Sequence, residues 1–485
     1  MGPRYGYFPK ASKTHIIAKS DELKERAREL FDGEGLQITS DGERHIGAVL
    51  GSESYRDSFV SEKVQKWVQD VIELSHIAKD EPQVAFSAYN TGLCHRWTFL
   101  QRTVRGISHL FLPLEQAICE MLLPALLGGS LSDIQRRIVA LPYRMGGLGI
   151  KNPVLTADNE YNASRQITAD LSRMICEQEM DLTRLDMNSV QQKKIETRVA
   201  REALLTTELQ DILSMLGDEE KKLLKCAGEK GASSWLSALP LKRYGYSLNK
   251  QEFRDAICLR YGWKISEMPI HCGCGSTNSI NHLLICKKGG YVTMRHNAIR
   301  DVEGKLLREV CTDIKIEPHL LPTNAEQIHG NVADNARLDI AARGVWSRYQ
   351  QTFMDVRITH PTAASHLHKS ASQLYAENER EKKNLYGDRV LHVERGSFVP
   401  LVFTTTGGMG PECVRLNKRI AELIARKTSE PYSIVLRHIR TRLRFALLRC
   451  TLIAIRGTRG RVVRDEEEEV GNISFNLIPQ VQDFN

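Results

Sequence analysis

The chain lacks several features that mark specialised classes of protein. Its eleven cysteines are spread from Cys94 to Cys450 without the dense spacing of a disulfide framework, and their number is odd, which favours a reducing intracellular compartment. No run of eighteen apolar residues occurs, and the first ten residues do not resemble a signal peptide. We therefore expect a soluble protein of the nucleus or cytoplasm that has no membrane partner.

The composition is that of an ordinary folded protein with a modest excess of basic residues. The 485 residues are 41% hydrophobic and 26% charged, which is enough for about two to four domains with their own cores. The formal charge of +8 is compatible with a polyanionic partner, but a small excess spread over so long a chain is weak evidence by itself. The distribution of the charged residues matters more than their sum.

The sequence pattern changes abruptly at His271, where cysteine, glycine, serine and asparagine replace a long helical and charged stretch. This is the clearest domain boundary in the chain. Before it, apolar residues recur at three- and four-residue spacing, as in Val64, Trp67 and Val71, which predicts mainly helices. We expect an α+β multidomain protein with the following segments: residues 1–60, 61–155, 156–268, 269–290, 291–460 and 461–485.

A cluster of cysteine and histidine residues follows this boundary. Cys272, Cys274, His282 and Cys286 have the spacing C-x-C-x7-H-x3-C, with the first pair on a glycine-rich turn and the second pair one helical turn apart. Thiolates and an imidazole in this arrangement fit tetrahedral Zn²⁺, and four protein ligands leave no open position for catalysis. We expect a structural zinc knuckle. His271 is an alternative ligand, and the opposing interpretation is a polar loop with unrelated free cysteines.

Two aspartates lie on successive short apolar segments after the cluster. Asp339 and Asp355 are each flanked by Leu, Ile, Phe, Met or Val, as in buried strands. A carboxylate among such neighbours is costly to bury unless it is paired. On adjacent strands, the two acids would together offer the hard oxygen ligands that Mg²⁺ prefers. The opposing interpretation is a salt bridge from Asp339 to Arg337 or Arg357.

The elements around these aspartates predict an α/β core. A helix over residues 291–311 precedes three strands, and a polar helix over residues 370–386 precedes a last strand over residues 397–404. This order gives a small mixed sheet flanked by helices, with both acids near one edge of the sheet.

Hydrolysis of a phosphodiester at such a metal site also needs a cation nearby. The metal polarises the phosphate and lowers the pKa of water, while the cation orients that water and offsets developing charge. Lys382 and Lys383 on the polar helix are candidates for this cation, and the opposing interpretation is a solvated face. Glu303 and Glu317 are candidate accessory carboxylates.

A helix over residues 432–456 carries Arg437, Arg440 and Arg444 at three- and four-residue steps. Leu and Ile residues supply an apolar stripe, so we expect the helix to pack on a core while its arginines bind the phosphates of a nucleic acid. Residues 404–411 form a glycine-rich turn of the kind that can hold an anion, but a plain tight turn is the simpler interpretation.

Taken in order, these motifs resemble the C-terminal half of the polyprotein of non-LTR retrotransposons that carry a restriction-like endonuclease. The resemblance rests on residues 12–14, 44–51 and 141–149, on the cysteine and histidine cluster, and on the motifs around Asp339 and Asp355. It covers nearly the whole chain. It implies the end of a reverse transcriptase palm, a helical thumb, a helical linker, a zinc knuckle and an endonuclease of the PD-(D/E)xK superfamily, in the order of the first five segments above. The acidic run that begins at Asp465 separately predicts a disordered tail for the last segment.

By this resemblance, the endonuclease nicks chromosomal DNA, and the freed 3′ hydroxyl primes copying of the element's RNA. Lys13 resembles a lysine of the palm, and residues 44–51 resemble the primer-grip turn. Asp339 and Asp355 match the family's two acids, which hold Mg²⁺, and Lys382 matches a displaced catalytic lysine. The implied partners are target DNA, element RNA and the polymerase portion of the same element.

Three departures from the family pattern accompany the resemblance. Leu338 replaces the usual proline before Asp339, and the His-x3-Cys spacing of the knuckle is one residue shorter than the family form. No Asp-Asp dipeptide, which a polymerase palm needs, occurs in the 485 residues, so we expect no polymerase activity. The first hypothesis is a Mg²⁺-dependent DNA endonuclease. The alternatives are an inactive nucleic-acid-binding remnant of the element and a helical protein with a zinc-stabilised loop and no nucleic-acid role.

Overall fold

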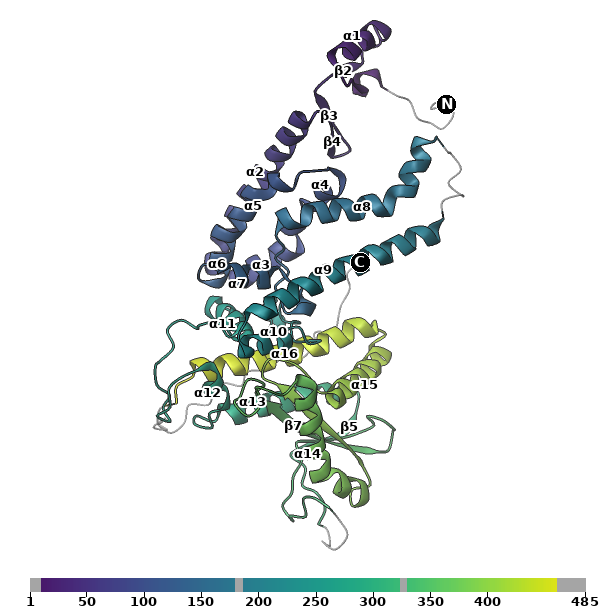
Figure 1. Ribbon diagram of the computed structural model, residues 1–485. Helices are drawn as coiled ribbons and strands as arrows, with labels where there is room; N and C mark the ends of the chain where they lie inside the picture. The colour runs from purple at the N-terminus through teal and green to yellow at the C-terminus, as the bar shows by residue number, and fades with distance from the viewer. Residues whose placement is uncertain (1–9, 179–185, 323–328, 460–485) are drawn as a thin grey trace. The chain divides into compact units, whose positions relative to one another are not determined.

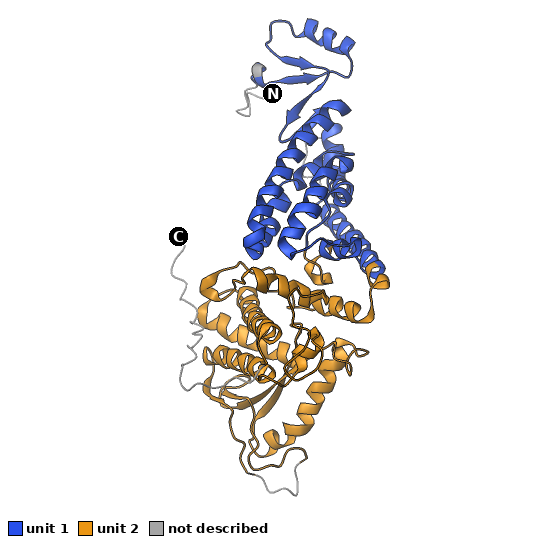
Figure 2. Ribbon diagram, turned by 90° about the vertical axis from the view of Figure 1, so that its left-hand side faces the viewer, with its two compact units in different colours: residues 1–140, 149–211 blue, residues 141–148, 212–485 orange. Residues whose placement is uncertain are grey.

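The computed structural model describes most of the chain as two compact units, each of which is described by itself (Figure 2). The described residues are 10–178, 186–322 and 329–459. Unit 1 comprises residues 1–140 and 149–211, and unit 2 comprises residues 141–148 and 212–485. The division between the units falls within one long helix, and the predicted boundary at residue 268 lies inside unit 2.

Unit 1 begins with two small pairs of strands around a helix. The strands of the first pair are parallel. The second pair is an antiparallel hairpin that includes residues 44–51. At the hairpin turn, Ile46 and Gly47 have positive φ angles of 48° and 82°, as in a type I′ turn, whose twist matches that of the strands it joins. These elements are β1 (His15–Ile17), α1 (Asp21–Leu30), β2 (Gln37–Thr39), β3 (Gly42–His45) and β4 (Ala48–Gly51).

The remainder of the described part of unit 1 is helical, as predicted. The ring of Trp67 stacks on Phe111 with centroids 6.3 Å apart, and Val64 and Val71 are buried on the same stripe of their helix. The predicted apolar spacing is therefore the core face of α2. The helices are α2 (Glu53–Asp80), α3 (Pro82–Thr91), α4 (Thr98–Thr103), α5 (Leu112–Ala117), α6 (Leu123–Leu127), α7 (Asp133–Ala140), α8 (Pro153–Cys176) and α9 (Met187–Met215).

One stretch of unit 1, Ser108–Leu127, is long and apolar enough to cross a membrane by length and composition, with a mean hydropathy of 1.6. Its side chains Leu114, Ile118 and Leu122 are fully buried. Packing inside the unit accounts for this apolarity, because the core helix of a globular unit meets the same criterion.

Unit 2 is built on a mixed four-stranded sheet, of which Figure 1 labels β5 and β7. The strand order is β5-β6-β7-β8. β6 runs antiparallel to both β5 and β7, whereas β7 and β8 are parallel. The predicted mixed sheet with flanking helices is confirmed, but the expected position of the two aspartates near one edge is wrong, because β6 and β7 are the central strands. The strands are β5 (Thr312–Ile316), β6 (Ile340–Arg343), β7 (Gln351–Thr359) and β8 (Ser397–Thr404). The helices are α10 (Asp218–Ala227), α11 (Lys250–Tyr261), α12 (Ile280–Ile285), α13 (Tyr291–Arg308), α14 (Ala371–His392), α15 (Pro411–Thr428) and α16 (Tyr432–Arg456).

Helices pack on both faces of this sheet. Met354 and Val356 of β7 belong to the main core, which also contains apolar residues of α13, α15 and α16. Phe353 of β7 belongs to a second core together with Val390 of α14. Because side chains alternate along a strand, Asp355 lies on the same face as Phe353, which is the face of α14.

Candidate metal centres

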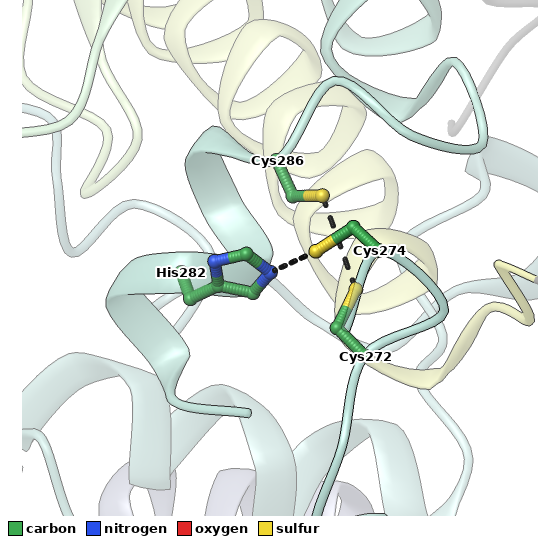
Figure 3. A group of neighbouring side chains, drawn as sticks. All are labelled: Cys272, Cys274, His282 and Cys286. Carbon is green, nitrogen blue, oxygen red and sulfur yellow. Dashed lines mark hydrogen bonds between the residues drawn. The ribbon is translucent and has the colours of Figure 1, made fainter. Parts of the chain in front are cut away.

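The cysteine and histidine cluster lies on a tight turn and a short helix. The N–H of Cys272 donates to a carbonyl four residues later at 2.8 Å, and Gly275 has a φ of +94°, which favours glycine. Ser279 caps the N-terminus of α12 by accepting a hydrogen bond from the N–H of His282 at 3.1 Å. Cys286 follows one helical turn later, so the helix presents both residues to the turn (Figure 3).

The four side chains converge on one position. Their ligand atoms all lie within 4.8 Å of one another. Cys272 Sγ lies 3.9 Å from Cys286 Sγ, and Cys274 Sγ lies 3.3 Å from His282 Nε2 (Figure 3). Hydrogen bonds from Ser276 lower the pKa of Cys274 to about 6, which favours the thiolate that metals bind. This group could hold a zinc ion with no position left open for catalysis.

Apolar packing connects the zinc-binding group to the rest of unit 2. Cys272 and Cys286 are buried together with Ala454 and Ile455 of α16 in a small core. His271, the alternative ligand, is exposed and stands outside the group of four. The interpretation as a loop with unrelated free cysteines does not hold, because the four side chains meet.

β6 and β7 bring the two aspartates together. Ile340 pairs with Met354, and the N–H of Asp339 donates to the carbonyl oxygen of Met354 at 3.1 Å. Asp339 immediately precedes β6, and these pairings bring it beside the part of β7 that carries Asp355. The side chains of Asp339 and Asp355 are 15% and 9% exposed. Burial raises the pKa of Asp355, and the charge of Asp339 acts in the same direction.

A histidine that the sequence did not single out lies against these strands. Nε2 of His296, on α13, is 3.1 Å from Asp339 Oδ2 and 3.1 Å from the carbonyl oxygen of Val356. The N–H of Val356 also donates to Asp339 Oδ2, at 2.6 Å. The hydrogen bond with Asp339 raises the pKa of His296, although burial opposes this. No short motif could predict the contact, because 43 residues separate His296 from Asp339.

The two candidate lysines on α14 have different partners. Nζ of Lys382 lies 2.7 Å from Asp355 Oδ2 in an ion pair that lacks hydrogen-bond geometry. Nζ of Lys383 lies 2.5 Å from Glu412 Oε1 on α15, and its side chain is 47% exposed. Lys382 therefore belongs to the aspartate group, whereas Lys383 does not.

The arginines that flank the aspartates bond to other residues. Arg337 Nη1 lies 3.4 Å from Glu317 Oε2, and Arg357 Nε donates to an asparagine of α14 at 3.2 Å. Both arginines bond to residues other than Asp339, so the alternative of a salt bridge from Asp339 to either of them is wrong. Glu317 pairs with Arg300 as well and is 46% exposed, so arginines and not the aspartates surround this candidate accessory carboxylate.

Glu303, the other candidate accessory carboxylate, is fully buried on α13. Its Oε1 accepts a hydrogen bond from Asn417 Nδ2 of α15 at 3.1 Å, and its Oε2 has no hydrogen-bond partner in the part of the chain that the structure describes. These contacts place Glu303 in the main core and apart from the aspartate group, so its expected accessory role is not supported. Burial raises the pKa of Glu303 to about 7.

Replacing Glu303 by glutamine is expected to stabilise the protein above neutral pH and to change little at pH 5. The folded-state pKa of about 7 lies above the ordinary value of 4.5, so between these values the folded state binds a proton that the unfolded state releases. The free energy of unfolding therefore falls by roughly 3 kcal/mol as pH rises through this window. The variant does not lose this free energy, because glutamine does not titrate. Chemical denaturation at pH 5 and pH 8 measures the difference, and an equal effect at both would contradict it.

The three arginines expected to bind nucleic acid do not share an exposed face. Arg437 is exposed, Arg440 is half-buried and Arg444 is only 7% exposed. Nε of Arg444 donates to the carbonyl oxygen of Ala232 at 3.0 Å, and burial lowers its pKa to about 9. Arg444 therefore does not belong to an exposed basic face, because α16 packs on several elements and helical spacing does not reveal which faces are covered. Arg437 remains a candidate.

The comparisons with known proteins identify no relative. No protein-family model matches the chain, and no curated protein sequence matches it. The fold and the candidate sites define an α+β protein that has a mainly helical N-terminal part, a Cys3His cluster that could hold zinc, and a mixed four-stranded sheet with flanking helices.

Proposed function

We propose that unit 2 is a Mg²⁺-dependent DNA endonuclease, and that it serves a non-LTR retrotransposon by nicking target DNA to prime reverse transcription. The observation that carries the proposal is the group formed by Asp339, which immediately precedes β6, and Asp355 of the neighbouring strand β7, with His296 against the first and Lys382 against the second. The element and the priming role rest on the resemblance of the motifs described above.

The oxygen atoms at this position have the chemistry that Mg²⁺ requires. Two carboxylates and the carbonyl of Val356 are hard ligands. Asp339 Oδ2 and the Val356 oxygen both lie 3.1 Å from Nε2 of His296, so both oxygens face this histidine. When bound, Mg²⁺ would polarise the phosphodiester and lower the pKa of a coordinated water.

The protein's own residues hold this group in position. His296 and the N–H of Val356 both bond to Asp339 Oδ2, which fixes the orientation of that carboxylate. Lys382 keeps an ammonium beside Asp355 in a place that is only 15% exposed. From there it can orient the attacking water and offset the negative charge that develops on the phosphate.

Nicking of supercoiled plasmid DNA tests the proposal. The zinc-loaded chain is incubated with the plasmid in buffer that either contains or lacks Mg²⁺, and open circles are counted with time. We expect open circles only with Mg²⁺. If the folded, zinc-loaded chain produces none in either buffer, the proposed function is overturned.

The two lysines provide a matched pair for the same assay. Lys382→Met is expected to slow nicking by about a hundredfold, because it removes the cation beside Asp355 and leaves a buried carboxylate unpaired. Lys383→Met removes only a partly exposed contact with Glu412 and is expected to change the rate by less than about threefold. Equal rates for the two variants would remove Lys382 from the proposed site.

The alternative of an inactive nucleic-acid-binding remnant has less support than it had from the sequence. It relied on the arginines of α16 and on the zinc knuckle, and Arg444 is buried against Ala232. Exposed Arg437 is one positive charge, and a single phosphate contact contributes little affinity at physiological salt.

A further inference from the structure

A small cavity lies inside unit 2 where α10, α11, α12, α16 and the loops that follow β7 and β8 meet. Its volume is about 30 Å³, which leaves room for roughly two or three water-sized groups. Asp339, Asp355 and Lys382 do not line it, so it is separate from the proposed endonuclease site. Its polar lining includes Arg260, Asn281, His360, Thr405, Thr406 and Arg444.

Two buried guanidinium groups line this cavity without a carboxylate partner. Arg260 and Arg444 are 6% and 7% exposed, and neither forms an ion pair within the described residues. Arg260 Nη2 donates to the carbonyl oxygens of Gly146 at 2.8 Å and Ala227 at 3.1 Å. Nη1 of Arg444 has no hydrogen-bond partner among the described residues. Two like charges buried in this way are costly unless an anion compensates them.

The loop after β8 is shaped around Arg444. Gly407 has a φ of +98°, and a Cβ added to it would lie 2.6 Å from the Cδ and Nε atoms of Arg444. Thr405 and Thr406, which precede this glycine, line the same cavity. The glycine-rich turn is therefore more than a tight connection between β8 and α15, because its backbone fits closely against the buried arginine.

The remaining walls of the cavity supply neutral hydrogen-bonding groups. His360 Nδ1 lies 2.7 Å from Thr405 Oγ1, and His360 Nε2 lies 2.8 Å from Asn281 Oδ1. Burial lowers the pKa of His360 to about 3, so its imidazole is neutral at physiological pH. The one carboxylate in the lining belongs to Glu219, which is exposed and accepts a hydrogen bond from Asn281 Nδ2 at 2.9 Å. It therefore neutralises neither arginine directly.

We propose that this cavity binds a single phosphate group between Arg260 and Arg444. A tetrahedral phosphate matches the charge of two guanidinium groups, its oxygens can accept from arginine and threonine donors, and its size suits a cavity of this volume. The same chemistry is offered by inorganic phosphate and by the terminal phosphate of a nucleic acid. The proposal does not depend on the endonuclease activity.

Thermal unfolding of the zinc-loaded chain in phosphate and in chloride at equal ionic strength tests the proposal. A ligand that binds only the folded state raises the unfolding temperature. We expect phosphate to raise it by several degrees relative to chloride, and calorimetric titration to give saturable binding. The absence of any phosphate-specific rise in the native chain would overturn the proposal.

Matched variants locate the site. Arg444→Met and Thr406→Val are expected to weaken phosphate binding at least tenfold, whereas Arg426→Met, which alters an exposed arginine of α15, should bind as the native chain does. Circular dichroism identifies any variant that does not fold, and Thr406→Val keeps the test valid if Arg444→Met fails to fold. Unchanged phosphate binding in folded Thr406→Val or Arg444→Met would overturn the assignment.

Two oligonucleotides of one sequence, with and without a 5′ phosphate, distinguish the sources of the anion. Stabilisation by the phosphorylated oligonucleotide alone, lost in Arg444→Met, would support a nucleic-acid end as the ligand. Stabilisation by inorganic phosphate with no difference between the oligonucleotides would support a free anion. Equal stabilisation by both oligonucleotides that survives in Arg444→Met, without an effect of inorganic phosphate, would contradict the site.

Discussion

Replacing either Asp339 or Asp355 by asparagine is expected to reduce Mg²⁺-dependent plasmid nicking by at least about a thousandfold. Each substitution removes one of the two carboxylates of the proposed site, and the loss of metal-based charge stabilisation costs several kcal/mol in the transition state. Initial rates of open-circle formation measure the effect. Mg²⁺ is varied in each assay, because weakened metal binding raises the concentration needed for half-maximal rate.

Asp301→Asn is the matched control for these two variants. Asp301 lies on α13 of the same unit, is 50% exposed and bonds to Arg300 at the surface. It should nick at the native rate. Equal rates for the native chain and the two site variants would show that the nicking comes from elsewhere, and the assignment of Asp339 and Asp355 would fail.

Cys272→Ser is expected to remove zinc from the protein and to lower the unfolding temperature of unit 2 by at least about 10 °C. The free energy of metal binding at such a site is folding free energy, since the ligands are not assembled in the unfolded chain. Cys272 is also buried against α16 together with Ala454 and Ile455, so loss of the metal loosens a small core as well as a loop. Metal analysis by mass spectrometry and thermal unfolding measure the two effects.

Cys176→Ser is the control, because Cys176 is an exposed free cysteine at the end of α8 in unit 1. It should retain one zinc per chain and the native unfolding temperature. Zinc retained in full by Cys272→Ser, or no zinc in the native protein purified without chelators, would refute the proposed zinc site.

The features that the sequence predicted correctly are those that short patterns encode. The C-x-C and H-x3-C pairs lie on a turn and on one helical turn, so their spacing alone brings each pair together. The apolar flanks of Asp355 predicted a buried strand, and β7 is one. The buried face of α2 was likewise predicted correctly, because its apolar residues recur at helical spacing and so form one continuous stripe.

The features that the sequence did not predict depend on contacts between distant segments. Adjacent lysines on a helix point about 100° apart, so only the packing of α14 decides that Lys382 and not Lys383 meets Asp355. His296 lacks any local signal of its contact with Asp339. Arg444 has the helical spacing of a surface residue, and its burial follows from segments more than two hundred residues away.

Helix α16 closes both the main core of unit 2 and the small core beneath the zinc-binding group, yet it is the last of the described helices along the chain. During synthesis, the strands of the sheet and the cysteine loop therefore leave the ribosome before the element that covers them. The apolar faces that α13 and α15 turn to α16 have no partner from that helix until it is made. The cores of unit 2 are therefore complete only once α16 has been made.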